Sequence, residues 1–309
     1  MNPKITTLSM YQFYKKMPDE QSARKYFEGI RWPKGRYCPH CGSFNTVPVI
    51  DEKPQPYRCK DCRKHFSVRT GTVLTSSKVT LHTWLLAAYL MHTAKKGVSS
   101  CQMARELGVT QKTAWLLCHK IREIWTVPTS RFNGVVEADE TYIGGKEKNK
   151  HASKKLNAGR GIVGKQVVLG VRERTGKVKA ITASSTEQHE IHSFINDNVN
   201  SGATLYTDEH RSYNGLQASY DHQSINHSAG EYVRGQAHTN GIESFWALLK
   251  RGYIGTFHHF SMKHAGRYVS EFASRNNNRY CDTVDILAIT AKNSIGKLLP
   301  YKELINVRS

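Results

Sequence analysis

Two Cys-x-x-Cys pairs constrain the fold of this chain more than any other feature of its 309 residues. The first pair is Cys38 and Cys41, the second is Cys59 and Cys62, and 17 residues separate the two pairs. Each pair places two thiolates on a tight turn, and the segment between them forms a hairpin that brings the turns together. We therefore predict a zinc ribbon over residues 31–75, with structural Zn²⁺ bound by all four thiolates.

The charge balance indicates a polyanionic partner. The chain has 45 Lys and Arg against 25 Asp and Glu, a formal net charge of +20 at pH 7. An excess of this size favours nucleic acid or an anionic membrane. The longest apolar run, residues 84–91, is too short to cross a bilayer, and the N-terminus has no secretory signal pattern. We expect DNA as the partner, no membrane association and a cytoplasmic location.

Residues 103–115 have the pattern of a helix-turn-helix. Gly108 allows a tight turn between two short helices, and Thr110 is placed to cap the second of them. In this motif the early residues of the second helix face the major groove. We expect contacts to DNA from Gln111, Lys112 and Thr113, and contacts to its backbone from Lys120 and Arg122. A helical pair that only packs the ribbon against the next domain is the alternative.

After residue 130 the apolar pattern changes to a period of two, which indicates strands. Strand candidates occupy residues 135–139, 166–171, 177–183, 203–208 and 222–227, and helix candidates occupy residues 186–199 and 238–251. Three strands, a helix, a strand, a further strand and a helix fit a ribonuclease H-like sheet flanked by helices. The same order also fits other α/β folds.

Three carboxylates occur at points in this pattern where they can converge. Asp139 lies on the first strand, Asp208 at the end of a later strand and Glu243 at the start of the last helix. Hard oxygen ligands suit Mg²⁺ or Mn²⁺, and two such ions activate the attacking and leaving oxygens of a phosphoryl transfer. Lys250 lies two turns after Glu243 on the same helix face, where it can hold a phosphate.

Each acid also has a structural alternative. Asn240 can cap the last helix, and Glu243 would then be its capping-box partner rather than a metal ligand. Asp208 can belong to a turn at the end of a strand, and Asp139 can lie on a solvated edge.

The longest motifs resemble those of a known family. They are VEADETYIGGK at residues 136–146, YTDE at 206–209 and HTNGIESFW at 238–246, followed by KRG at 250–252. These motifs are similar to those of the ISXO-like bacterial insertion-sequence transposases, relatives of the eukaryotic Merlin elements. The resemblance covers nearly the whole chain. It implies that Asp139, Asp208 and Glu243 are the catalytic acids and that Lys250 is their basic partner. Because some family members carry Asn at the third position, Asn240 is a second candidate for that role.

The resemblance implies a DDE transposase with a ribonuclease H-like α/β catalytic domain, preceded by the zinc ribbon and the helix-turn-helix. It would bind terminal inverted repeats, cleave them with Mg²⁺ or Mn²⁺, and join the 3′-hydroxyl to target DNA. A homodimer or larger assembly is expected because two ends are joined, and the location would be the bacterial cytoplasm, at the nucleoid. The expected domains are a helical segment (1–30), the ribbon (31–75), the helix-turn-helix domain (76–127), the catalytic domain (131–285) and a C-terminal tail (286–309).

Two other functions are compatible with parts of the pattern. A zinc-ribbon and helix-turn-helix regulator with a non-catalytic second domain would explain the charge, but it does not require converging carboxylates. A ribonuclease H-like nuclease without strand transfer would explain the carboxylates, but recognition of DNA ends by a helix-turn-helix is more typical of a transposase.

Overall fold

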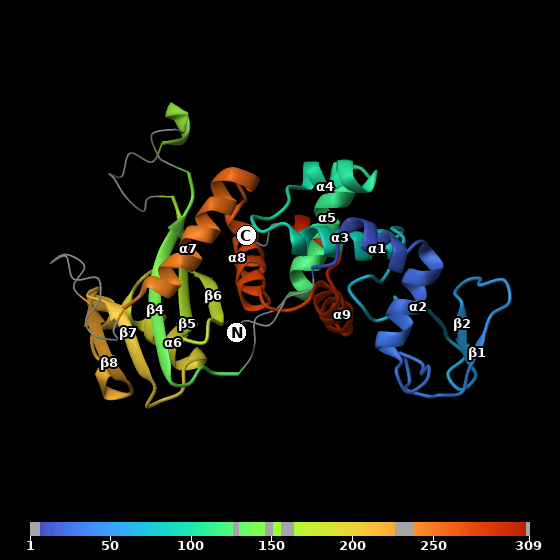
Figure 1. The fold of residues 1–309 in the computed structure, drawn as a ribbon, viewed down its shortest axis with the longest axis horizontal. Helices are drawn as coiled ribbons and strands as arrows, with labels where there is room; N and C mark the ends of the chain where they lie inside the picture. The colour runs from blue at the N-terminus through green and yellow to red at the C-terminus, as the bar shows by residue number, and fades with distance from the viewer. Residues whose placement is uncertain (1–6, 126–129, 146–150, 156–163, 226–237, 307–309) are drawn as a thin grey trace. The chain divides into compact units, whose positions relative to one another are not determined.

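The computed structural model describes residues 7–125, 130–145, 151–155, 164–225 and 238–306 (Figure 1). The chain divides into two compact units. The helical unit consists of Met1–Trp125 together with Tyr280–Ser309, and the sheet unit is Thr126–Arg279. No helix in the described part of the chain is both long and apolar enough to cross a membrane.

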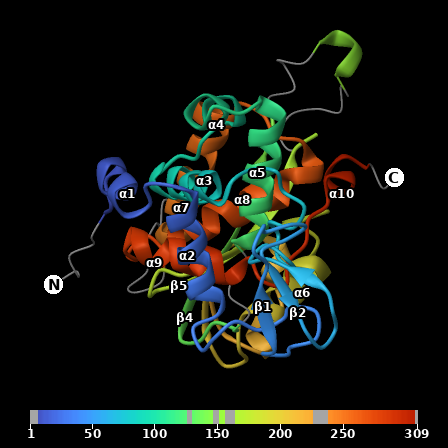
Figure 2. The ribbon, with the colours of Figure 1, turned by 90° about the vertical axis from the view of Figure 1, so that its right-hand side faces the viewer.

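The helical unit is built on helices (Figure 2), most of which begin at a polar N-cap residue. Side chains of Asp19, Thr80 and Thr110 each accept a hydrogen bond from a backbone N–H in the first turn of the helix that follows. Gly108, with φ of 64°, ends α4 in the left-handed conformation that glycine adopts without strain. The helices are α1 (Met10–Lys16), α2 (Glu20–Arg31), α3 (Leu81–Thr93), α4 (Ser100–Leu107), α5 (Gln111–Ile124), α9 (Thr283–Asn293) and α10 (Tyr301–Ile305).

The C-terminal residues are part of this helical core, which differs from the tail that we expected over residues 286–309. Leu287 and Leu304 are buried in the same apolar cluster as the side chains of α3 and α5. The indole N–H of Trp125 also donates to Oγ1 of Thr290 at 3.0 Å. The physical reason is that α9 carries apolar residues on one side, and burying that side against α3 removes it from water.

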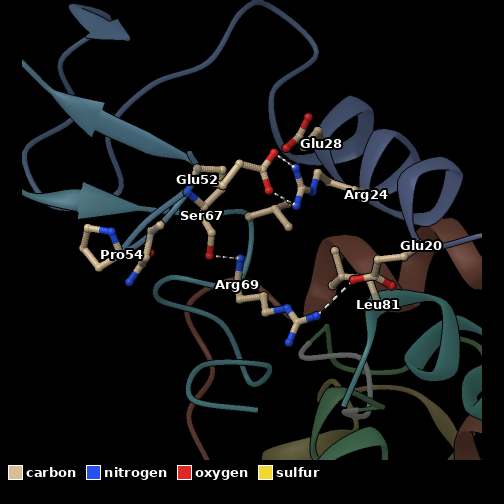
Figure 3. A pocket seen from close by; sticks show the side chains of 11 residues that line it. Glu20, Arg24, Glu28, Glu52, Pro54, Ser67, Arg69 and Leu81 are labelled. Carbon is tan, nitrogen blue, oxygen red and sulfur yellow. Dashed lines mark hydrogen bonds and ion pairs between the residues drawn. The ribbon is translucent and has the colours of Figure 1, made fainter. Parts of the chain in front are cut away.

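The ribbon has three short antiparallel strands, β1 (Thr46–Pro48), β2 (Tyr57–Cys59) and β3 (His65–Phe66). Ion pairs connect its surroundings to helix α2. Arg24 makes two hydrogen bonds to Glu52, at 2.6 and 2.8 Å, and Arg69 reaches Glu20 at 3.2 Å. These side chains line a cavity of about 260 Å³ (Figure 3). Because the acids and guanidinium groups are paired with one another, we assign this cavity to packing between α2 and the ribbon.

The sheet unit contains a mixed five-stranded sheet in the order β6-β5-β4-β7-β8. The strands are β4 (Val135–Ile143), β5 (Gln166–Glu173), β6 (Val178–Ala183), β7 (Thr204–Asp208) and β8 (Asp221–Ile225). Neighbours among the first three strands of the order are antiparallel, whereas β4–β7 and β7–β8 are parallel. All five predicted strands are therefore present, and residues 226 and 227 of the last prediction lie outside the described residues.

Helices cover both faces of this sheet, and alternation along each strand assigns its side chains to one face or the other. On one face Val136, Leu169 and Leu205 pack with α6 (Gln188–Asn198). On the other face Val168 and Val178 pack with residues of α7 (Asn240–Gly252) and α8 (Met262–Asn277). The π-helical turn is Tyr253–Phe257, and the short 3-10 helices are Ala152–Lys154, Arg211–Tyr213 and Leu216–Ala218.

Candidate functional site

The four cysteines of the ribbon gather in one cluster. Their sulfur atoms all lie within 4.8 Å of one another, with Cys38 and Cys62 at 3.6 Å and Cys41 and Cys59 also at 3.6 Å. Four sulfurs at about 2.3 Å from one ion, in tetrahedral geometry, would be separated by about 3.8 Å. The cysteines are free thiols rather than disulfides. Their arrangement is consistent with a structural zinc ion, as the sequence predicted.

In the second pair, backbone N–H groups stabilise the thiolate form of Cys59. N–H groups of Cys62 and Asp61 point at the sulfur of Cys59 and lower the pKa of that thiol to about 7. Metal binding requires deprotonated sulfur, and Cys59 can lose its proton near neutral pH.

In the sheet unit, Asp139 lies on the face of β4 that packs against α7. The indole N–H of Trp246 donates to its Oδ2 at 2.9 Å, and the N–H of Glu140 donates to its Oδ1 at 2.8 Å. Burial, together with the charges of Glu140 and Asp208, raises the pKa of Asp139 to about 8. A divalent cation would relieve this repulsion, so the donor set fits a metal ion.

Asp208 is the last residue of β7, the parallel neighbour of β4. Glu137 pairs in register with Tyr206, and two residues further along each strand bring Asp139 and Asp208 to the same level and face. Oδ1 of Asp208 accepts a hydrogen bond from the N–H of His210 at 3.0 Å. Asp139 in the middle of β4 and Asp208 at the end of β7 therefore lie side by side on one face of the sheet.

Glu243 lies in the first turns of α7, where its side chain is exposed. Oγ1 of Thr239 donates to Oε1 of Glu243 at 2.9 Å. Thr239 is the N-cap of α7 and makes no side-chain cap bond, so the capping box through Asn240 is wrong. Asn240 and Lys250 are also exposed on this helix. Among the described residues, only the four cysteines form a group of metal ligands within 4.8 Å, so Glu243 is not drawn in to that distance of both aspartates.

A second carboxylate lies on the opposite face of β4 from Asp139. The hydroxyl of Tyr213 donates to Oε2 of Glu140 at 2.6 Å. Burial raises the pKa of Glu140, and the charge of Asp208 raises it further. The sequence did not identify the Tyr213 contact, because residues 73 positions apart give no local signal for it.

The helix-turn-helix candidates at the start of α5 differ in exposure. Gln111 and Lys112 are exposed, and Thr113 is half-buried. Nε2 of Gln111 donates to Oγ of Ser100 on α4 at 2.8 Å, and the backbone N–H of Thr113 donates to Oγ1 of Thr110 at 3.3 Å. Lys112 is therefore the exposed cation of this turn.

Lys120 and Arg122 are buried, which corrects the prediction that they contact the DNA backbone. Their relative exposures are 8% and 3%. The ammonium of Lys120 donates to the carbonyl of Val73 at 2.8 Å, and burial lowers its pKa. Because α5 is covered along most of its later turns, these basic side chains do not present their charges to solvent.

Comparisons with known proteins agree with the two-part organisation. Residues 131–277 match the model of the ISXO2-like transposase domain, and residues 18–65 match that of the transposase zinc-ribbon domain. The chain is 31% identical over 244 residues to "Uncharacterized protein in transposable element ISH50" of Halobacterium salinarum, covering 75% of this chain and 82% of that one. It is also 29% identical over 121 residues to "Uncharacterized transposase-like protein" of Haemophilus influenzae, covering 38% of this chain and 97% of that one. The chain therefore belongs to the ISXO2-like family of DDE transposases with an N-terminal zinc ribbon.

Proposed function

We propose that this protein is a transposase that binds the terminal inverted repeats of its insertion sequence, cleaves the ends and joins the freed 3′-hydroxyl to target DNA. The observation that carries the proposal is the pairing of Asp139 with Asp208. Both lie at the same level of adjacent parallel strands, and burial, then the charges of Glu140 and Asp208, raise the pKa of Asp139. Two carboxylates held together in this way suit divalent cations.

The strand order supports a ribonuclease H-like fold for the sheet unit. An antiparallel β6-β5-β4 half continues into a parallel β4-β7-β8 half, and helices cover both faces. In this arrangement the central strand β4 and its parallel neighbour β7 carry the two aspartates.

The proposed site consists of Asp139, Asp208 and Glu243, which would hold Mg²⁺ or Mn²⁺, with Lys250 as a phosphate contact. When bound, the ions would lower the energy of the attacking and leaving oxygens in the displacement. Asp139 would be fixed by its hydrogen bonds from Trp246 and Glu140. Glu243, which is exposed on α7, would complete the site when metal and DNA draw it toward the aspartates.

DNA recognition is assigned to the start of α5. Lys112 would contact a phosphate, and Gln111 and Thr113 would lie beside it at the groove. The net charge of +20 supports binding to DNA. Joining two ends in one event requires two copies of the chain or more, so we propose a homodimer or a larger assembly.

The decisive experiment measures binding and cleavage of end DNA in parallel. Asp208→Asn should keep the affinity for the inverted repeat and lose cleavage in Mg²⁺ and in Mn²⁺. Asp221→Asn is the matched control, since Asp221 is an exposed acid at the start of the neighbouring strand β8. Cleavage by Asp208→Asn at the wild-type rate would refute the active-site assignment. Binding of end DNA without cleavage by the wild type would instead favour a regulator.

A further inference from the structure

Strand β4 and helix α7 are joined by two polar contacts on the face that carries Asp139. Oε2 of Glu137 accepts a hydrogen bond from the backbone N–H of Ile242 at 2.7 Å. Oδ2 of Asp139 accepts one from the indole N–H of Trp246 at 2.9 Å. Glu243 directly follows the first attached residue of α7 and precedes the second by three positions.

The distance between the two contacts along α7 matches the distance between them along β4. The four residues from Ile242 to Trp246 rise about 6 Å along a helix. The two residues from Glu137 to Asp139 span about 6.6 Å along a strand. Because these lengths agree, the first turns of α7 lie alongside β4 without a change of register. A shift of α7 would break both contacts together.

Glu137 is a fully buried carboxylate with basic side chains around it. Its side chain has an exposure of 0%, and Oε1 lies 3.5 Å from Nη1 of Arg174 and 3.8 Å from Nη1 of Arg172. Nδ1 of His238 also lies 3.8 Å from Oε1 of Glu137. Oε2, the other carboxylate oxygen of Glu137, accepts from one of the N–H groups that a helix leaves unpaired at its start, where negative charge is favourable. Glu137 is therefore held by one hydrogen bond through Oε2, whereas Oε1 has only ion-pair neighbours and no hydrogen bond within the described part of the chain.

Two glycines leave the room that these contacts need. A Cβ on Gly241 would lie 1.4 Å from Nη1 of Arg172 and 2.6 Å from Oε2 of Glu137. A Cβ on Gly170, the register partner of Asp139 on β5, would lie 2.5 Å from the ring of Trp246. Any larger residue at either position would therefore displace a member of one contact.

We propose that Glu137 and Trp246 are positioning residues, which hold α7 against β4 and so fix the carboxylate of Asp139 and the helical turn that carries Glu243 for metal binding. This inference rests on the function proposed above. Trp246 sets the rotation of the Asp139 carboxylate while each of its oxygens keeps a lone pair for a cation. Glu137 sets the position of the helical turn that carries Glu243.

The experiment measures Mn²⁺ binding to the full-length, zinc-loaded protein by the electron paramagnetic resonance signal of free Mn²⁺. Glu137→Gln and Trp246→Phe should each weaken Mn²⁺ binding about 10- to 100-fold, as losses of hydrogen-bond partners around metal ligands do. The Mn²⁺ concentration for half-maximal cleavage of end DNA should rise by the same factor, and saturating Mn²⁺ should restore part of the rate.

Matched controls separate positioning from general destabilisation. Glu271→Gln alters another fully buried carboxylate of the sheet unit, which pairs with Arg275 on α8. Tyr253→Phe removes a polar atom from a buried aromatic ring in the apolar cluster that also contains Trp246. Both controls should lower the unfolding temperature about as much as the test variants and leave Mn²⁺ binding unchanged.

Wild-type Mn²⁺ binding by Glu137→Gln and Trp246→Phe would overturn the proposal. So would an equal loss in the two controls, or binding that Asp139→Asn leaves intact. A wild-type protein that binds Mn²⁺ through Asp139 but never cleaves end DNA would refute the proposed function. The positioning roles would then stand if the two test variants still weakened Mn²⁺ binding.

Discussion

The indole of Trp246 and the carboxylate of Asp139 meet because the residue opposite Asp139 on β5 has no side chain. Trp246 donates to Oδ2 of Asp139 at 2.9 Å, and its ring occupies the space where a Cβ of Gly170 would stand. The packing of one helix residue thus depends on a glycine and ends in a hydrogen bond to a proposed metal ligand. The Trp246 ring therefore packs against Gly170 and also donates a hydrogen bond to Asp139.

Replacing Gly170 with Ala should therefore affect stability and chemistry together. The new methyl group would push the Trp246 ring away from Asp139, and overpacking of this kind costs about 1–3 kcal/mol. We expect a lower unfolding temperature and a loss of cleavage that exceeds the loss of folded protein. Gly29→Ala is the control, since a Cβ there meets nothing within 4 Å. Wild-type cleavage by Gly170→Ala would show that the ring moves without consequence.

The raised pKa of Asp139 predicts a specific pH dependence of stability in the absence of Mg²⁺ and Mn²⁺. Its pKa rises from 3.8 to about 8 on folding. Between these values the folded protein keeps a proton that the unfolded chain has lost. The free energy of unfolding should therefore fall as the pH rises through this window, by at most about 1.4 kcal/mol per pH unit.

The comparison with Asp139→Asn tests this dependence. Asparagine stays neutral at every pH, so the wild type should lose stability relative to the variant as the pH rises from 5 to 8. Urea unfolding at several pH values measures the difference, and added Mg²⁺ should reduce it. A stability difference that stays constant across the window would contradict the raised pKa.

Substitutions of Glu243 and Asn240 show which of the two residues has the third catalytic role. We expect Glu243→Gln to reduce cleavage by about 100-fold or more, since a proposed metal ligand loses its charge. Asn240→Ala should change cleavage much less, and because Asn240 is not the N-cap of α7 it should cost little stability. The rate of end cleavage at fixed Mn²⁺ decides between them. A larger loss for Asn240→Ala would move the third role to that residue.

Zinc content tests the cysteine cluster. Wild-type protein should carry about one zinc ion per chain by atomic emission, because four thiolates close a tetrahedral site. Cys59→Ser should remove it, and the helical unit should lose stability with it, since binding of structural zinc contributes on the order of 10 kcal/mol. Cys101→Ser, which alters an exposed free cysteine elsewhere in the unit, should retain the ion. Equal zinc content in both variants would refute the ribbon.

Lys112 and Lys120 should behave differently in DNA binding. Lys112→Ala should lower the slope of log K against log salt concentration by about 1, as the loss of one phosphate contact does. Lys120→Met should leave this slope unchanged, because its ammonium is buried and bonded to Val73. Fluorescence anisotropy of end DNA at several salt concentrations measures both. A lowered slope for Lys120→Met would place that residue at the DNA after all.

Local patterns predicted the elements of the fold well. Cysteine spacing predicted the ribbon, and alternation in residues 177–183 predicted β6. Gly108 indicated the end of α4 and Thr110 the start of α5. These features depend on neighbours in the chain, so a single sequence contains them.

Contacts across the fold were not predictable in the same way. The hydrogen bond of Trp246 to Asp139, a residue 107 positions earlier, has no local signal in the sequence. Lys120 was expected at the surface because lysine is seldom buried, yet the later turns of α5 are mostly covered and its ammonium bonds to the carbonyl of Val73. Residues 286–309 were expected to form a tail, because their packing against α3 depends on a part of the chain far away in the sequence.

The return of α9 and α10 to the helical core has a consequence for the order in which the protein can mature on the ribosome. Trp125 makes its bond to Thr290 only after the whole sheet unit has been synthesised. The sheet unit is continuous in sequence and can fold while translation proceeds, whereas the helical unit waits for the last residues. A nascent or truncated chain would therefore expose an apolar helical surface, and the helical unit becomes stable only when synthesis is complete.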